Sequence, residues 1–245
     1  MNITRNVVVS GVFFSVAVIL LLSTFYTQHK PHKGRFIFVD LGANRADSLE
    51  TFLKHKGAKF DFDFPRPSWA THDQAEIYLF EANPVFNPAL VEAKQKYDEL
   101  GINVNIYPST VVDVKDGTRT FYLDNVNTEH DYWGSSTHAT HPDAVKSHSN
   151  GTEIVAIGIS RWLLMNTLPR DFVVVKMDIE GSEFEVIPKM VEMSIWTVLD
   201  YLFVEWHGGF IQNDEGFPQT EARVKKAQEV LISKGVQMPS YDSGA

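Results

Sequence analysis

Short apolar runs alternate with amphipathic stretches along the chain from residue 36 onward. The apolar runs are typical of buried strands, which we expect over residues 36–40, 77–81, 103–107, 172–178 and 201–207. The amphipathic stretches predict helices over residues 45–56, 88–100, 182–193 and 219–234. Strands that alternate with helices form βαβ units. The pattern therefore predicts an α/β fold, with a Rossmann-like, doubly wound, mostly parallel sheet covered by helices on both faces.

Two segments interrupt this alternation. Residues 57–75 are rich in Phe and Pro and resemble an insertion between the first helix and the second strand. Residues 118–158 contain two further predicted strands, over 118–124 and 153–158, joined by a polar loop rich in His, Ser, Thr and Asn. Long loops of this kind often cover a binding site, so we expect this one to lie over the substrate.

A long uncharged stretch precedes the alternating region. Residues 7–26 are rich in Val, Leu, Ile and Phe, and a helix of this length spans roughly 30 Å, the thickness of a bilayer core. A buried core helix would show a polar stripe, and a cleaved signal peptide would have a shorter apolar run. The stretch therefore predicts a single-pass membrane anchor, between a tail (1–6) and a basic linker (27–35) that leads into a catalytic domain (36–245).

The side of the membrane that this domain faces stays open. Lys30, Lys33 and Arg35 follow the apolar stretch, which favours a cytoplasmic domain by the positive-inside rule. A glycosylation sequon at residues 150–152 would matter only in a lumen, and one N-terminal anchor is typical of endoplasmic reticulum or Golgi enzymes.

Composition narrows the class of function. The formal net charge is −9 and no cluster of Lys or Arg stands out, so we expect no nucleic-acid partner. The chain has no cysteine, which excludes disulfides, thiol nucleophiles and Cys-ligated zinc.

Candidate ligand-binding residues follow the first two predicted strands. In an open α/β sheet, ligands bind beyond the carboxyl ends of the strands, where the strand order reverses. Gly42 allows the backbone to approach a ligand, Asp40 can hold a polar or cationic group, and Glu81 can accept hydrogen bonds from both ribose hydroxyls.

A nicotinamide dinucleotide fits these residues poorly. Asn44 and Asp47 occupy the positions of the later glycines in the G-x-G-x-x-G motif that binds a diphosphate. S-adenosylmethionine has no phosphate and does not need this motif.

Together these motifs resemble the FkbM-like family of class I methyltransferases. The matching segments are 38–44 (FVDLGAN), 80–84 (FEANP), 175–183 (VKMDIEGSE) and 204–207 (VEWH), and the resemblance spans residues 36–240. It implies S-adenosylmethionine as the cofactor and O-methylation of a small molecule or sugar. It also implies that Asp40, Gly42 and Asn44 line the methionine end of the cofactor, that Glu81 holds the ribose, and that the segment from Ser109 to Asp113 borders the adenine.

The chain departs from the family pattern in two places. Such methyltransferases commonly carry a glycine soon after the first turn, where this chain has Arg45 and Ala46. Beyond residue 234 there is room for one strand, whereas the usual methyltransferase sheet closes with an antiparallel hairpin. These departures leave open a catalytically degenerate, membrane-tethered binding protein, and a nicotinamide-dependent oxidoreductase is the less favoured alternative.

Candidate catalytic residues follow the last two strands. Asp178 and His207 are the candidate bases for removing a hydroxyl proton, and the ordinary pKa of His is the better matched to neutral pH. Glu180 and Glu183 are explained equally well as a helix cap and a first-turn carboxylate. Asp178, Glu205 and His207 could also hold a divalent ion, but their spacing does not establish one, so the sequence predicts no metal.

Overall fold

The computed structural model describes residues 34–128, 131–212 and 216–242, and all its elements belong to the compact unit Arg35–Ala245. The stretch 7–26, on which the membrane anchor was predicted, lies outside the described residues. In the part of the chain that is described, no helix is both long and apolar enough to cross a bilayer. No membrane-spanning helix among the described residues therefore supports the predicted single-pass membrane location, and we withdraw it.

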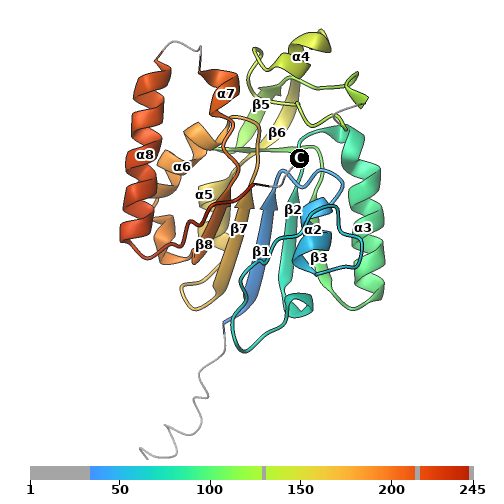
Figure 1. Cartoon of the computed structure of the whole chain (residues 1–245), viewed down its shortest axis with the longest axis vertical. Coiled ribbons are helices and arrows are strands. Elements are labelled where there is room, and N and C mark those ends of the chain that lie inside the picture. The colour runs from blue at the N-terminus through green and yellow to red at the C-terminus, as the bar shows by residue number, and fades with distance from the viewer. Residues whose placement is uncertain (1–33, 129–130, 213–215, 243–245) are drawn as a thin grey trace, which may run out of the picture. The chain divides into compact units, whose positions relative to one another are not determined.

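A parallel five-stranded sheet forms the centre of the fold (Figure 1). Its strands are β1 (Phe36–Leu41), β2 (Glu76–Phe80), β3 (Asn103–Tyr107), β7 (Phe172–Met177) and β8 (Tyr201–Val204). They lie in the order β3-β2-β1-β7-β8, so all five predicted strands are confirmed. β1 and β7 are buried along almost their whole length, which explains why both read as continuous apolar runs.

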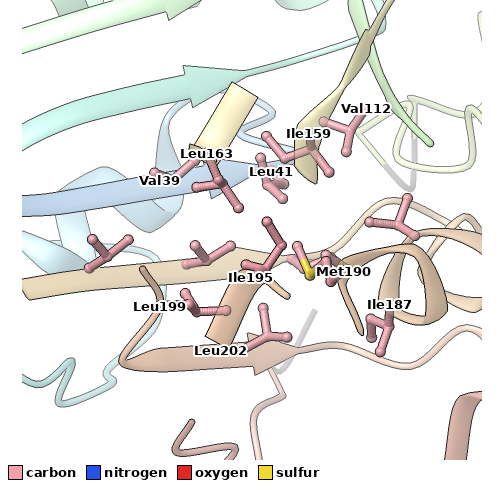
Figure 2. Packing of buried hydrophobic residues seen from close by; sticks show 14 of the residues in the cluster. Val39, Leu41, Val112, Ile159, Leu163, Ile187, Met190, Ile195, Leu199 and Leu202 are labelled. Carbon is pink, nitrogen blue, oxygen red and sulfur yellow. The ribbon is translucent and has the colours of Figure 1, made fainter. Parts of the chain in front are cut away.

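Helices cover both faces of this sheet, as the doubly wound arrangement requires. On one face, alternate residues of β1 such as Phe36 and Phe38 pack against α2 (Asp47–Phe52) and α3 (Asn87–Glu99). On the other face, Val39 and Leu41 belong to a buried cluster with residues of three further helices, and Figure 2 shows part of this cluster. These are α5 (Ile159–Asn166), α6 (Glu183–Glu192) and α8 (Phe217–Ser233).

A small second sheet lies beyond the carboxyl ends of the central strands (Figure 1). It contains β4 (Thr110–Asp113), β5 (Gly117–Phe121) and β6 (Thr152–Gly158) in the order β4-β6-β5. β5 and β6 confirm the two extra strands expected in this region. Two short helices, α4 (Pro142–Lys146) and α7 (Gly208–Ile211), complete this end. Short 3-10 turns lie at His72–Gln74, Pro84–Phe86 and Ile195–Thr197.

The segment after α8 pairs with the last strand of the central sheet. Gln237 forms an isolated parallel bridge with Tyr201, the first residue of β8. Tyr241 is buried, and its ring contacts Phe203 of β8 and Phe62 of the 57–75 insertion. The insertion and the C-terminal segment therefore cover one face of β8 together.

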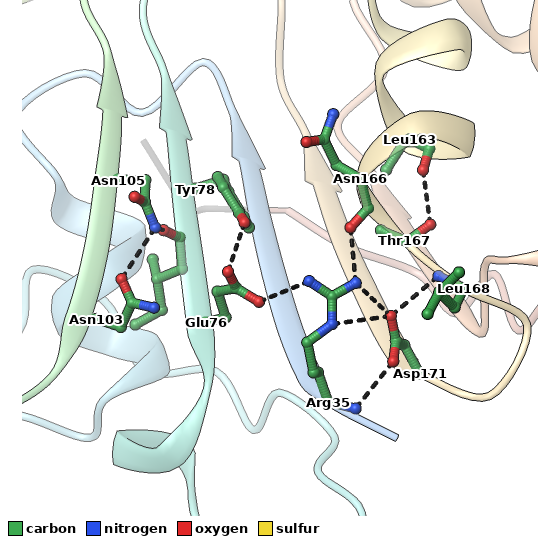
Figure 3. A network of polar contacts seen from close by, with 11 residues as sticks. Arg35, Glu76, Tyr78, Asn103, Asn105, Leu163, Asn166, Thr167, Leu168 and Asp171 are labelled. Atoms are coloured by element: carbon green, nitrogen blue, oxygen red, sulfur yellow. Dashed lines mark hydrogen bonds and ion pairs between the residues drawn. The ribbon is translucent and has the colours of Figure 1, made fainter. Parts of the chain in front are cut away.

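An ion-pair network joins the amino ends of three central strands (Figure 3). The Arg35 guanidinium donates hydrogen bonds to Asp171 Oδ2 at 2.6 and 3.2 Å and to Glu76 Oε2 at 2.9 Å. Burial raises the pKa of Asp171, but the bonds from Arg35 outweigh it and the net shift is downward. The network fixes the starts of β1, β2 and β7, far from the ends where ligands bind.

Candidate functional site

A cavity of about 660 Å³ opens at the carboxyl ends of β1, β2 and β7. β1 pairs with β2 on one side and with β7 on the other, so the strand order reverses at β1. This reversal point is where ligands bind in open α/β sheets, and the volume lies within the range of small-molecule sites. Predicted residues Gly42, Asn44, Glu81, Asp178 and His207 all line the cavity.

Gly42 brings the end of β1 into close contact with β7. Its φ is +85°, and a Cβ at this position would lie 1.7 Å from the carbonyl oxygen of Asp178. Only glycine fits such an approach. The turn continues through Asn44 (φ 49°) and Ala46 (φ 70°), so Ala46 adopts the left-handed conformation that glycine favours. This conformation explains why a glycine near this position would suit the turn.

Glu81 joins the turns that follow β1 and β2. Its Oε2 accepts a hydrogen bond from the backbone N–H of Asn44 at 2.8 Å, and its Oε1 accepts one from Asn83 N–H at 2.6 Å. Burial raises the pKa of Glu81 to about 7, although the two N–H donors favour the ionised form. Each carboxylate oxygen keeps a second lone pair for a ligand.

Lys176 is a buried cation beneath the cavity. Its Nζ donates to the carbonyl oxygen of Gly42 at 2.7 Å and lies 3.2 Å from Asp40 Oδ1 and 3.1 Å from Asp178 Oδ2. Burial opposes its charge, but the two carboxylates outweigh burial and raise the pKa of Lys176. For Asp40, burial outweighs the attraction of Lys176 and raises the pKa to about 6. Asp40 does not line the cavity; it sits under the loop as the partner of Lys176.

Ser109 and Asp113, expected to border the adenine, flank the cavity without lining it. Ser109 Oγ accepts a hydrogen bond from Asn87 Nδ2 at 2.8 Å, and Asp113 lies 3.8 Å from Arg119. The residues between them, Thr110 to Val112 in β4, do line the cavity. The middle of this segment therefore reaches the cavity, while its two named ends have other contacts.

His207 lies at the end of the cavity formed by β7 and β8. Its Nδ1 is 3.1 Å from Glu183 Oε1, and its Nε2 is 3.7 Å from both Asp178 Oδ1 and Glu180 Oε2. Burial lowers its pKa, but the bond to Glu183 and the surrounding carboxylates outweigh burial and raise the pKa of His207 to about 10. In this arrangement the imidazole is protonated at neutral pH and donates hydrogen bonds.

The loop between β7 and α6 is held by Glu183. This side chain is fully buried and accepts hydrogen bonds from the backbone N–H groups of Ile179 (2.8 Å) and Gly181 (2.9 Å). Glu180 adopts a left-handed φ of 52° and places its carboxylate near His207 and His141. Burial raises the pKa of Glu180, and this outweighs the lowering of the pKa by His141.

Comparison with known proteins decides which class of enzyme this geometry belongs to. Residues 40–228 match the family model of the methyltransferase FkbM domain. The chain belongs to the FkbM methyltransferase family. No curated protein and no solved structure shows significant similarity to it. As a family member the chain is a methyltransferase, and membership implies a methyl donor.

Two parts of this FkbM methyltransferase site were not assigned from the sequence. Lys176 was recognised only as part of the 175–183 motif, because a single lysine within an apolar strand gives no sign of its partners. Register explains the pairing, since Asp40 of β1 lies opposite Lys176 of β7. His141 comes from the distant polar loop, and only the fold brings it beside Glu180.

The two irregular segments meet over the cavity of the FkbM domain. Lys59 and Phe60 from the insertion, and Tyr132 and Trp133 from the polar loop, line it together. The Lys59 ammonium lies 4.5 Å from the centre of the Trp133 ring, a cation–π contact between the two segments. The expectation that the polar loop lies over the site agrees with this placement.

Proposed function

We propose that the chain is an S-adenosylmethionine-dependent methyltransferase that acts on a hydroxyl group of a small molecule or sugar. The observation that carries the proposal is the buried Glu81 carboxylate. It directly follows β2 and lines the same cavity as Gly42. An acid at this position can accept hydrogen bonds from the ribose hydroxyls of a nucleoside.

The residues that line the cavity suit this cofactor. The free lone pairs of Glu81 would hold the ribose, and the turn from Gly42 to Asn44 would hold the methionine end. Thr110 to Val112 would border the adenine with largely apolar contacts. Asn44 and Asp47, in place of glycines, leave no cradle for a diphosphate, which disfavours a nicotinamide dinucleotide.

The chain's own part in the chemistry is to bind and orient the acceptor. S-adenosylmethionine, when bound, supplies a methyl group on a positively charged sulfur that leaves with the bonding electrons. Asp178 lines the cavity and would accept the proton that the acceptor hydroxyl releases as its oxygen bonds to the methyl carbon. His207, held by Glu183, lines the same end of the cavity and would help to hold the acceptor in line.

A transfer assay tests this proposal. The full-length chain is incubated with radiolabelled S-adenosylmethionine and a panel of sugars and hydroxylated small molecules. We expect label on at least one hydroxyl, and Asp178→Asn should reduce turnover about 100-fold or more while cofactor affinity stays nearly unchanged. Label found only on nitrogen or carbon acceptors would contradict the hydroxyl assignment.

A further inference from the structure

Side chains from β7, β8 and the loop that joins β7 to α6 converge beside the cavity. One ligand atom each from Asp178, Glu180 and His207 lies within 4.8 Å of the other two, and all three residues line the cavity. We propose that these three side chains bind a divalent first-row transition-metal ion. The site is additional to the cofactor contacts of Gly42 and Glu81.

The hydrogen bonding of His207 is that of a metal ligand. In metal sites the ligating histidine nearly always donates its second ring N–H to a carboxylate or a carbonyl. Here Nδ1 faces Glu183 Oε1 at 3.1 Å, and the backbone N–H groups of Ile179 and Gly181 fix Glu183 in turn. This support directs Nε2 toward Asp178 and Glu180, each 3.7 Å away. A divalent ion bound there would displace the proton that Nε2 carries in its absence.

The His141 side chain gives an independent indication of a ligand site at this place. Its side chain is 2% exposed and its Nε2 makes no hydrogen bond, although it lies 3.4 Å from Glu180 Oε2. Its Nδ1 accepts the N–H of Asp143, so Nε2 is the donor nitrogen. A buried donor without a well-directed acceptor is costly, and a hydroxide or alkoxide oxygen bound to the ion would satisfy it.

The local charge also favours a cation. Asp178, Glu180 and Glu205 all face His207 Nε2 at 3.7–4.0 Å. Lys176 is the other cation beside Asp178, and it is shared with Asp40 and with the Gly42 carbonyl. A divalent ion would therefore bind where carboxylates outnumber the cations that face them.

The donor set limits the class of ion. Carboxylates suit magnesium, calcium and manganese, whereas imidazole suits zinc, iron and nickel, so a mixed set fits manganese or iron best. Three protein ligands leave positions open toward the cavity. A hydroxyl bound there would be held beside the cofactor and would lose its proton to water more readily. This use of the ion rests on the proposed function, but binding of the ion does not.

Manganese binding tests the site directly. The full-length chain, freed of metals with EDTA and then dialysed, is titrated with MnCl₂ and followed by electron paramagnetic resonance. We expect one saturable Mn²⁺ per chain, with affinity at least 10-fold lower in Glu180→Gln and in His207→Gln. Glu185→Gln is the matched control, since it removes the same charge in the first turn of α6, where Glu185 pairs with Arg119.

The outcomes separate this inference from the proposed function. A folded wild-type chain without saturable Mn²⁺ binding overturns the metal site, and so does equal weakening in Glu185→Gln. Thermal unfolding checks that each variant is folded before its affinity is compared. S-adenosylhomocysteine binding is measured on the same samples in EDTA. A loss of Mn²⁺ binding can then be distinguished from a loss of cofactor binding.

Discussion

At the residue scale, the buried ion pair between Lys176 and Asp40 supports the loop that would hold the cofactor. Replacing Lys176 by Met removes the counter-ion of a fully buried carboxylate and the donor to the Gly42 carbonyl. Breaking a buried pair in this way costs about 3–5 kcal/mol. We expect Lys176→Met to lower the free energy of unfolding by this amount in urea titrations.

A double variant is the control for this prediction. Asp40→Asn combined with Lys176→Met removes both charges, so most of the lost stability should return. If the double variant is as unstable as Lys176→Met alone, the ion pair is not the cause of the loss.

Glu81 gives the site a predictable pH dependence. Burial raises its pKa to about 7, so the carboxyl is mostly protonated at pH 6 and mostly ionised at pH 8. An ionised carboxylate is the stronger acceptor for ribose hydroxyls. We therefore expect affinity for S-adenosylhomocysteine to rise up to about 10-fold between pH 6 and pH 8, as measured by calorimetry.

The matched variant isolates Glu81 as the cause. Glu81→Gln retains the size of the side chain but cannot ionise, so its affinity should be weaker and independent of pH across this range. A variant that keeps the wild-type pH profile would assign the effect to another group.

At the scale of elements, the close approach of β1 and β7 at Gly42 is the tightest constraint on the site. In Gly42→Ala the added Cβ would overlap the Asp178 carbonyl oxygen, which requires the strand ends to separate. Gly57→Ala is a matched control, because Gly57 has a similar φ of +94° with nothing within 4 Å of an added Cβ. Both changes pay the backbone cost of about 1 kcal/mol.

Their difference therefore measures the contact itself. We expect Gly42→Ala to abolish S-adenosylhomocysteine binding and to lower the melting temperature well below that of Gly57→Ala. Equal melting temperatures with intact binding in both variants would contradict the packing at this turn.

Elements with a strong hydrophobic period were predictable from the sequence, and elements defined by tertiary contacts were not. The central strands and the helices α3, α6 and α8 were expected near their observed bounds. β4 was missed because Thr110–Asp113 is very short and follows β3 directly. α5 was missed because it is only 8 residues long and follows β6 directly, with Gly158 both ending the strand and capping the helix.

The positions of the candidate site residues were predictable from the sequence, but their interactions were not. Positions at strand ends, such as Gly42, Glu81, Asp178 and His207, follow from the rule that ligands bind beyond those ends. The protonation of His207 and the pairing of Asp40 with Lys176 depend on neighbours that are distant in the chain. No local pattern carries that information.

At the scale of the molecule, the segment after α8 and the 57–75 insertion together cover one face of β8. Tyr241 and the insertion residues Phe62 and Phe64 pack against Phe203 of β8. We expect Tyr241→Ala to reduce the free energy of unfolding by about 3–5 kcal/mol, as large-to-small core substitutions do.

Tyr241→Phe is the control for this packing. The Tyr241 hydroxyl is buried without a hydrogen-bond partner, so removing it should leave stability unchanged or increase it. Urea unfolding of both variants separates the contribution of the ring to the free energy of unfolding from that of the hydroxyl. An alanine variant as stable as the wild type would show that this segment does not close the fold.

The central claim is that the cavity between β1, β2 and β7 binds the methyl donor through Glu81 and Gly42. Isothermal titration of the folded, full-length chain with S-adenosylhomocysteine and, separately, with NAD tests it most directly. We expect saturable one-to-one binding of S-adenosylhomocysteine and no measurable heat with NAD. A folded chain that gives no heat with S-adenosylhomocysteine, or that binds NAD instead, would contradict it.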